Sequence, residues 1–433
     1  MEDHFETLEQ VYEDRFSRQY GFWRNYVRQV IYRYLDCGIL HNGFARVRCG
    51  DCGHEFLLAF SCKRRHFCPS CHQKRVVEFG EWLCEEVIKA VPHRHLIFSL
   101  PKMLRRYFLY DRKLLADLSR CAWETLKVFI KEVDPVEGAV PGAVIAIQSF
   151  GDFLGYNPHA HILLTDGCFH DNGMFRVAPR FDPKALEEIF RHKVFRLLIS
   201  KGKITEDIVK LLKSWRHSGF HVFCGNRIQP GDKDAMESLA RYIIRACFSQ
   251  ERMTYIPAES KVIYVSKNGK EKKEFEALEW LAAMCSHIPD KSMQMVHYYG
   301  YYSNVSRGKR KQADQDGVIP YIIEDKGSNK EYRKNWARLI QKIYEVDPLV
   351  CPKCQGKMKV IAFIEDDEVI KKILKHLGLW EVKKRAPPKT CPELVEWIKS
   401  LPLTKNISYE PSDTGHPPFY PDPDYPVEMY IPQ

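Results

Sequence analysis

Segments with helical periodicity alternate with short apolar runs along most of the chain. Near the N-terminus, apolar side chains recur at helical spacing, at Phe5, Leu8 and Val11, so residues 5–36 are expected to form one or two helices. By the same criterion, and with Pro101 as a helix-opening residue, further helices are expected at 75–90, 101–132, 184–213, 234–245, 275–285 and 331–345.

Short runs rich in β-branched and aromatic residues predict the strands. They lie at 95–100, 143–150, 159–165 and 219–224, and residues 252–265 indicate a further β-hairpin. Gly151 and Gly155 mark the connection between the second and third runs, which therefore form an antiparallel hairpin. Antiparallel strands mixed with helices place the chain in the α+β class.

Composition narrows the function classes. The 433 residues suffice for two or three domains, and a net charge of +10 favours a polyanionic partner. No apolar run approaches the roughly 18 residues of a membrane span, and the acidic N-terminus has no signal peptide, so we expect a cytoplasmic protein. Neither a G-x-x-x-x-G-K-[ST] nor a G-x-G-x-x-G motif is present, so neither nucleotide hydrolysis nor a dinucleotide cofactor is indicated.

Paired cysteines indicate zinc. The two C-x-x-C motifs Cys49/Cys52 and Cys68/Cys71 are separated by fifteen residues, a spacing typical of one tetrahedral Zn²⁺ site held by four thiolates. Additional potential ligands lie nearby and leave room for a second ion or an altered set: Cys37, Cys62, His54, His66 and His72. Many cations in this segment suggest that it also contacts DNA phosphates, although a purely structural role is the alternative.

A third motif, Cys351-Pro-Lys-Cys354, has no second pair beside it in the sequence. If this motif binds a metal, the remaining ligands must come from elsewhere in the chain, and Cys285, His287 and Cys391 are the candidates.

Two His-x-His pairs compete for a catalytic metal. His159 and His161 fall in a buried strand, so both imidazoles point to one face. His93 and His95 flank an arginine after a turn, which favours the first pair. A hard cation such as Mg²⁺ or Mn²⁺ needs at least one oxygen ligand, for which Gln148 is preferred and Asp152 is the other candidate.

Tyr242 is the candidate nucleophile. It lies in the helix predicted at 234–245, where Arg241 and Arg245 flank it and could hold a phosphate and favour the phenolate. The rivals lie in the stretch 296–311, in which aromatic residues alternate with cations. Because Gly300 and Gly308 indicate a loop there, this stretch is interpreted instead as a single-stranded DNA-binding segment that uses Tyr299, Tyr302, Arg307, Lys309 and Arg310.

These motifs together resemble one known family. The resemblance covers residues 20–365 and is carried by Gly43-Phe-Ala-Arg-Val-Arg-Cys49, Gln148-Ser-Phe-Gly151, Asn157-Pro-His-Ala-His161, Leu239-Ala-Arg-Tyr242 and Asp347-Pro-Leu-Val-Cys-Pro-Lys-Cys354. The chain is similar to the transposases of the ninety-one family of bacterial insertion sequences, which belong to the HUH endonuclease class. Two-tyrosine members carry tyrosines four residues apart, whereas Ser238 stands four residues before Tyr242 here, so a single-tyrosine variant is expected.

The resemblance implies a helical and zinc-ribbon-like N-terminal domain followed by an HUH-type antiparallel sheet flanked by helices. It assigns His159 and His161 to the metal and Tyr242 to the attack that nicks single-stranded DNA at the element ends and transfers the strand to its target. The expected location is the bacterial cytoplasm, at the nucleoid. The alternatives are a zinc-containing DNA-binding protein without catalysis, and a replication initiator or relaxase of the same chemistry.

The expected domain division follows from these motifs. Residues 1–90 form the zinc-binding, DNA-binding domain and 91–310 the catalytic domain. Residues 311–410 form a basic region with the Cys351/Cys354 motif, and the Pro-rich residues 411–433 form a disordered tail.

Overall fold

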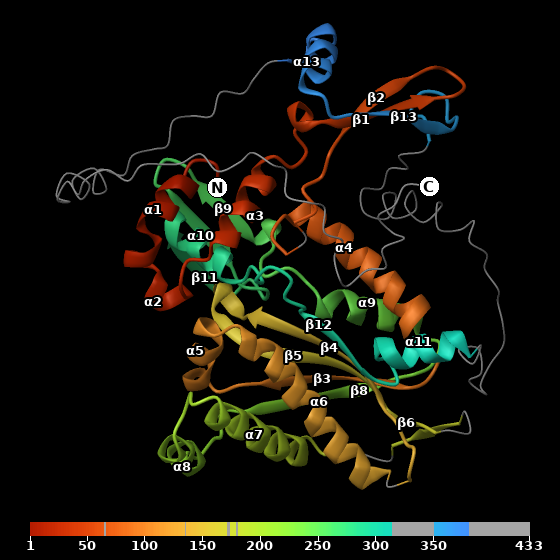
Figure 1. Cartoon of the computed structure of the whole chain (residues 1–433). Coiled ribbons are helices and arrows are strands. Elements are labelled where there is room, and N and C mark those ends of the chain that lie inside the picture. The colour runs from red at the N-terminus through yellow and green to blue at the C-terminus, as the bar shows by residue number, and fades with distance from the viewer. Residues whose placement is uncertain (65, 135, 171–173, 179–180, 314–349, 381–433) are drawn as a thin grey trace.

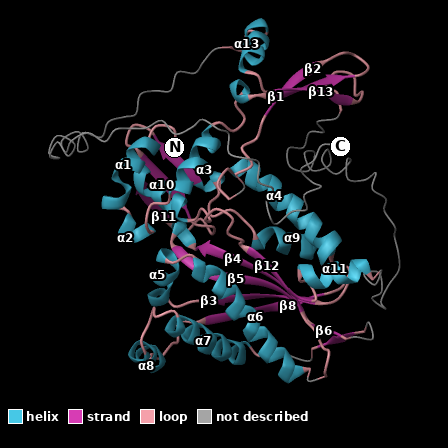
Figure 2. Cartoon of the chain, in the orientation of Figure 1, coloured by secondary structure: helices cyan, strands magenta, loops and turns pink. Residues whose placement is uncertain are grey.

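The computed structural model describes residues 1–64, 66–134, 136–170, 174–178, 181–313 and 350–380 (Figure 1). The helix predicted at 331–345 and the predicted tail at 411–433 lie outside these residues. Within them, no helix is both long and apolar enough to cross a membrane. Helices and antiparallel sheets are both abundant (Figure 2), which confirms the α+β class.

A five-stranded antiparallel sheet forms the centre of the fold. Its strand order is β12-β4-β5-β3-β8. The strands are β3 (His93–Ser99), β4 (Gly142–Phe150), β5 (Tyr156–Thr165), β8 (His221–Ile228) and β12 (Val296–Gly300). β4 and β5 form the predicted hairpin, with Gln148 directly opposite His159.

Alternating side chains divide this sheet into two faces. On the first face, apolar residues such as Phe98, Ala160 and Ile162 pack against helices that follow β3 and β7. These helices are α5 (Lys102–Tyr110), α6 (Lys113–Val133), α7 (Pro183–Ser200) and α8 (Glu206–Ser214). A small hairpin of β6 (Gly167–Phe169) and β7 (Phe175–Val177) extends beyond the sheet (Figure 1).

The second face of the sheet carries the histidine pair. Helices α4 (Pro69–Trp82) and α9 (Lys233–Ile243) cover it, packing on each other and on Val144, Ala146 and Leu163. α9 turns its buried residues Met236, Ala240 and Ile243 towards the sheet, and the Asp232 carboxylate caps its N-terminus by accepting from the Ala235 amide.

The N-terminal helices pack against a segment that is distant in sequence. α1 (Phe5–Arg15), α2 (Ser17–Tyr20) and α3 (Asn25–Leu35) share one core with residues 247–288. That segment contains β9 (Met253–Ile256), β10 (Lys261–Val265), β11 (Lys272–Glu276) and α10 (Ala277–Ser286). The predicted boundary at residue 90 therefore separates parts of the chain that form a common core.

A separate three-stranded sheet joins residues 44–59 to residues 358–364, which belong to the last described range. β1 (Phe44–Cys49) lies between β2 (Glu55–Ala59) and β13 (Met358–Ile364), and the helix α13 (Asp367–His376) follows (Figure 1). Finally, α11 (Asn304–Gln312) is a helix where a loop was predicted; Ser303 caps it by accepting from the Ser306 amide, which offsets the cost of Gly308 in its interior.

Candidate active site

The histidine pair lies in the buried middle of the central sheet. His159 and His161 are 7 % and 1 % exposed, on the β5 face that α9 covers. Their Nε2 atoms are 3.0 Å apart. Two nitrogens at this separation fit the first coordination shell of a single divalent ion, in which each metal–nitrogen distance is about 2.1 Å.

Hydrogen bonds and burial keep both rings ready to bind a metal. The Nδ1–H of His159 donates to the carbonyl oxygen of Asn157 at 2.7 Å, which leaves Nε2 as the lone-pair nitrogen. Burial lowers the pKa of His159 to about 4, and burial together with the charge of His159 lowers the pKa of His161 to about 2. Both imidazoles are therefore neutral at pH 7, the form that ligates metal.

A third histidine, His95, which the sequence did not assign to this site, contacts His161. The Nε2 atom of His95 lies 3.0 Å from Nδ1 of His161, and the two rings are stacked with an interplanar angle of 8°. If His161 offers Nε2 to a metal, its Nδ1–H donates to His95. Burial lowers the pKa of His95 to about 4, so this residue can act as the neutral acceptor.

Gln148 is positioned to supply an oxygen ligand. It lies across the β4–β5 pair from His159 and is 3 % exposed. Its Nε2 donates to the carbonyl oxygens of Tyr242 and Ile243, at 3.2 and 2.8 Å. Its Oε1 is buried and has no hydrogen-bond partner among the described residues. An unsatisfied buried acceptor beside two imidazoles suits the oxygen ligand of a hard cation.

Tyr242 lies over the histidines. Its ring meets that of His161 edge to face, with centroids 5.3 Å apart, and that of His95 at 6.1 Å. The Arg245 guanidinium is 4.7 Å from the centroid of the Tyr242 ring, and the Lys267 ammonium is 5.8 Å from it. Lys267 belongs to the β10–β11 turn, a remote segment that no pattern in the sequence connects with α9.

Arg241 does not share the position of Arg245. Its guanidinium pairs with Glu237, one helical turn earlier. The aliphatic part of its side chain packs closely over Gly80 of α4, in the space that a Cβ atom there would occupy. Arg241 therefore ties α9 to α4, and only one of the two flanking arginines contacts the tyrosine.

The two tyrosines predicted to stack on DNA bases pack against other side chains of the protein, Tyr302 fully buried and Tyr299 half-buried. Tyr302 is fully buried, and its hydroxyl lies 2.7 Å from Nε2 of His93. Burial also raises the pKa of Tyr302 well above its ordinary value. Tyr299 stacks on Trp123 at 5.3 Å and its hydroxyl bonds to Ser119. Tyr299 lies on β12, which pairs with β4, and Tyr302 follows that strand in the core. The segment is therefore not the base-stacking loop that was predicted, and Tyr302 has no exposed face for stacking.

The cations that follow occupy α11 in two different ways. Arg307 packs over Trp82 and Tyr298, with distances to the ring centroids of 5.3 and 5.9 Å, and Arg310 lies 3.7 Å from the Tyr301 ring centroid. Lys309 is exposed. The basic character of this helix agrees with a DNA contact, but the aromatic rings hold two of its arginines in place.

The cysteines form two four-thiol clusters with an unexpected pairing. The first contains Cys37, Cys62, Cys68 and Cys71, and the second contains Cys49, Cys52, Cys351 and Cys354. Neighbouring Sγ atoms such as Cys37 and Cys71, or Cys52 and Cys351, lie 3.5–3.8 Å apart, and all four sulfur atoms of each cluster lie within 4.8 Å of one another. Zinc–sulfur bonds of about 2.3 Å in a tetrahedron place the sulfur atoms about 3.8 Å apart, so both clusters fit Zn²⁺.

This arrangement corrects the predicted ligand set of Cys49, Cys52, Cys68 and Cys71. Cys49 ends β1, whereas Cys68 caps α4 after the β1–β2 hairpin has led the chain away. β13 pairs with the other edge of β1, with Met358 opposite Cys49, and so brings the third C-x-x-C motif to the first. Cys285 and His287, two suggested partners for that motif, are buried around α10, and Cys391 lies outside the described residues.

Comparison with known proteins identifies two family segments. A family model described as "Transposase zinc-binding domain" matches residues 7–100, and one described as "Putative transposase" matches residues 142–310; together they cover more than half of the chain. No solved structure matches significantly.

Two curated relatives extend the similarity over most of the chain. The "Transposase for insertion sequence element IS801" of Pseudomonas savastanoi pv. phaseolicola is 23% identical over 368 residues, which cover 79% of this chain and 85% of the relative. The "Putative transposase y4qJ" of Sinorhizobium fredii (strain NBRC 101917 / NGR234) is 24% identical over 345 residues, covering 73% and 84% respectively.

Proposed function

The chain belongs to the transposases of the ninety-one family of bacterial insertion sequences, and we propose that Tyr242 is its nucleophile. In this proposal the enzyme nicks single-stranded DNA at the ends of its element and transfers the strand. The observation that carries it is the edge-to-face contact of the Tyr242 ring with His161, at 5.3 Å between centroids. A phenol on a helix beside two neutral imidazoles suits attack on a phosphate held at those imidazoles.

The covalent step is balanced within the substrate and the tyrosine. The phenol oxygen of Tyr242 attacks the phosphorus in line with the bond to O3′. The new oxygen–phosphorus bond forms as the bond to O3′ breaks, the phenol proton leaves to water, and the 3′ oxygen takes up a proton. The products are a 5′-phosphotyrosine and a free 3′-OH. Because the phosphotyrosine keeps the energy of the phosphodiester, strand transfer needs no nucleotide cofactor.

The neighbouring side chains would prepare this attack. Arg245, at 4.7 Å from the Tyr242 ring centroid, stabilises the phenolate and neutralises charge on the phosphate. His159 and His161, with the Oε1 of Gln148, would hold Mg²⁺ or Mn²⁺, which supplies polarisation of the scissile phosphate when bound. His95 fixes the ring of His161. The two cysteine clusters would each hold a structural Zn²⁺.

The test is the trapping of a covalent adduct. The protein is incubated with Mn²⁺ and oligonucleotides from the ends of its element, and a protein–DNA species that survives denaturation is expected. Tyr242→Phe should abolish it while DNA affinity stays within about twofold of the parent, because binding rests on many phosphate contacts. Tyr298→Phe is the matched control, since its ring packs on Trp82 away from the histidines and the variant should still form the adduct.

Peptide mapping identifies the attacking residue. A nucleotide on the peptide that contains residues 298–302 would overturn the assignment of Tyr242. A protein that binds these oligonucleotides but forms no adduct under any metal condition would favour the alternative, a zinc-containing DNA-binding protein without catalysis.

A further inference from the structure

The described residues cover only part of the second face of the central sheet, on which the histidine pair lies. Helices α4 and α9 pack over β4 and β5. Two strands away from β5, at the β8 edge of the sheet, the side chains of His221 and Phe223 on this face are exposed. On β3, which lies between β5 and β8, Ile97 and Ser99 are half-buried. An uncovered strip of the sheet therefore runs from the histidine pair across β3 to β8.

The pairing of the strands aligns an exposed aromatic ring with the histidine pair. Ile97 of β3 lies opposite His161 of β5 on one side and opposite Phe223 of β8 on the other. Because directly opposed residues of antiparallel strands point to the same face, these three side chains form one row across the sheet. Neighbouring strands lie about 4.8 Å apart, so the row from β5 to β8 is about 10 Å long.

Contacts with its neighbours hold Phe223 at the edge of this row. Its ring meets that of His95 edge to face, with centroids 6.1 Å apart, and His95 in turn stacks on His161 at 5.2 Å. Gly225 leaves room for the ring, because a Cβ atom there would lie 3.4 Å from Cε1 of Phe223 and 3.1 Å from the carbonyl oxygen of His95. Even so, Phe223 is 44 % exposed. The ring is thus supported on one side and open on the other.

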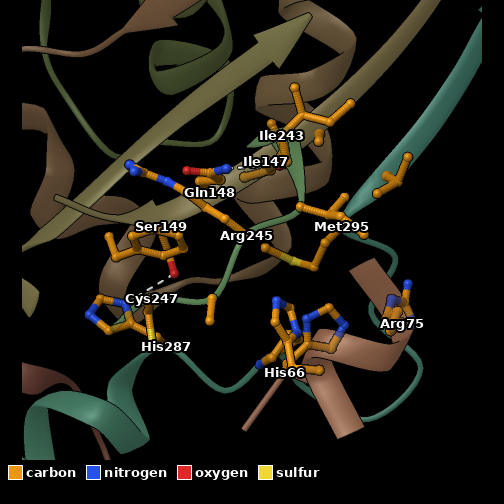
Figure 3. A pocket seen from close by; sticks show the side chains of 17 residues that line it. His66, Arg75, Ile147, Gln148, Ser149, Ile243, Arg245, Cys247, His287 and Met295 are labelled. Carbon is orange, nitrogen blue, oxygen red and sulfur yellow. Dashed lines mark hydrogen bonds between the residues drawn. The ribbon is translucent and has the colours of Figure 1, made fainter. Parts of the chain in front are cut away.

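The charges around this strip suit a nucleic acid strand. Among the described side chains that β3, β5 and β8 direct to this face, none is acidic. At the covered end, the Arg245 guanidinium and the Lys267 ammonium lie 4.7 and 5.8 Å from the centroid of the Tyr242 ring. Figure 3 shows the Arg245 side chain extending past Gln148 and away from Arg75. Cations at one end and an open aromatic ring at the other match the backbone and the bases of single-stranded DNA.

We propose that Phe223 is a stacking platform for an unpaired nucleobase next to the scissile phosphate. The proposal rests on the function proposed above, because that function places the scissile phosphate at His159 and His161. A strand held there passes over β3 to the open edge of the sheet, where a neighbouring base stacks on the exposed side of the Phe223 ring. Since every base has a π-face, this contact positions the strand without reading its sequence.

The binding of labelled single strands tests the platform. Fluorescein-labelled oligonucleotides from the element ends are titrated by anisotropy with a reference protein, the Tyr242→Phe variant, in which no reaction occurs. One probe is intact, and the others each carry one abasic site at successive positions around the cleavage point. Adding Phe223→Ala should weaken binding of the intact probe at least about fivefold, the lower end of the effect of removing one base–aromatic stack. Phe223→Trp should bind within about twofold of the reference, because indole also offers a ring for stacking.

The abasic probes separate stacking from a structural effect. At one position, the missing base should weaken binding by the reference protein as much as Phe223→Ala weakens binding of the intact probe. With that abasic probe, Phe223→Ala should cause no further loss, because the two changes remove the same contact. The slope of log K against log salt should stay unaltered, since no charge is removed.

Phe22→Ala provides the matched control. Phe22 is also an exposed phenylalanine, but its ring contacts Tyr110 of α5, a helix that covers the other face of the sheet. This variant should bind every probe as the reference protein does. Thermal unfolding of each variant is measured alongside. If Phe223→Ala does not fold, Phe223→Leu carries the test, because leucine keeps an apolar side chain but has no ring.

Two outcomes would overturn the platform. One is unchanged binding of the intact probe by the folded Phe223→Ala variant, and the other is a loss of affinity that is equal with every abasic probe. A covalent adduct of the parent protein together with either outcome would remove the platform and leave Tyr242 as the nucleophile. The absence of an adduct, together with the expected loss confined to one abasic position, would remove the nucleophile assignment and leave the platform.

Discussion

Replacing Cys351 by serine should cost the protein one of two zinc ions, although Cys351 lies far outside the segment that matches the zinc-binding family model. The structure places its Sγ 3.5 Å from that of Cys52, 299 residues earlier in the chain. The parent protein should therefore contain two zinc ions per chain, and the Cys351→Ser variant one. The Cys68→Ser variant should also contain one, because Cys68 belongs to the other cluster.

The size of the effect depends on what the second ion holds together. Each doubling of a closed loop costs about 0.6 kcal/mol, and the loop from Cys52 to Cys351 is roughly four doublings longer than the loop from Cys52 to Cys68. Chain entropy therefore disfavours the cluster that contains Cys52 and Cys351 by about 2.5 kcal/mol, relative to a cluster that contains Cys52 and Cys68. Packing of β13 against β1, around the buried Val47 and Met358, offsets this cost in the folded protein. Without its zinc ligand, β13 should detach from β1 well before the central sheet unfolds.

The assay combines zinc counting with hydrogen exchange. Zinc released by a thiol-blocking reagent is quantified with a chromogenic chelator for the parent, Cys49→Ser, Cys68→Ser, Cys351→Ser and the Cys49→Ser/Cys68→Ser double variant. If Cys49 and Cys68 belong to different clusters, the double variant should have lost both ions. Amide protection in Cys351→Ser should fall in β1 and β13 but not in β5. A Cys351→Ser protein with the parent's zinc content would refute the ligand set that joins Cys49 and Cys52 to Cys351 and Cys354. Single Cys49 and Cys68 variants that lose the same ion would refute it too.

The remaining predictions concern the central sheet and His287, which packs against the end of β4. His161→Ala should reduce adduct formation at least a hundredfold while oligonucleotide affinity changes less than about twofold, because one metal ligand is removed and the phosphate contacts remain; a failure to bind in anisotropy would contradict this. Tyr302→Phe should lower the free energy of unfolding in urea by about 1–3 kcal/mol, since the buried Nε2 of His93 loses its partner, and should leave single-strand affinity unchanged, in contrast to a base-stacking role. Burial lowers the pKa of both His93 and His287 to about 4, below the value of about 6.5 in the unfolded chain. The unfolded state therefore binds more protons between these values, and stability should fall as pH drops from 6.5 to 4, by at most about 3 kcal/mol per group; urea midpoints that rise on acidification would show the wrong sign.

Much of the fold followed from local patterns, because the relevant forces act over a few residues. β4 and β5 are evident in the sequence as short apolar runs. Because side chains alternate between the two faces of a strand, His159, His161 and Gln148 share a face once the two strands pair as a hairpin. The helix that carries Tyr242 was likewise apparent from its apolar spacing.

Contacts between segments that are distant in the chain could not be predicted from local sequence patterns. His95 contacts His161 only because β3 lies next to β5, and nothing local in the sequence specifies the order of those strands. The same limit explains the error over Tyr299 and Tyr302. Their glycine-flanked, cation-rich surroundings resemble a loop, but Tyr299 lies half-buried on β12, which pairs with β4, and Tyr302 just after it is fully buried, so tertiary context overrides the local signal.

The zinc ligands show why a local pattern with a good spacing can still be assigned to the wrong partner. Each C-x-x-C pair was recognised as a pair, since a C-x-x-C turn presents two thiolates whatever lies opposite. Pairing of β1 with β13 brings Cys351 and Cys354 to Cys49 and Cys52 and outweighs the shorter loop, and the single cysteines Cys37 and Cys62 complete the other cluster. The second cluster connects residues 351–354, which follow the segment that matches the "Putative transposase" model, to residues 49–52, which precede it. This cluster can therefore form only after the chain has been made as far as Cys354. The first cluster draws on residues 37–71 alone. The two ions should therefore separate experimentally: removal of the second should affect the attachment of β13 and leave the first cluster in place.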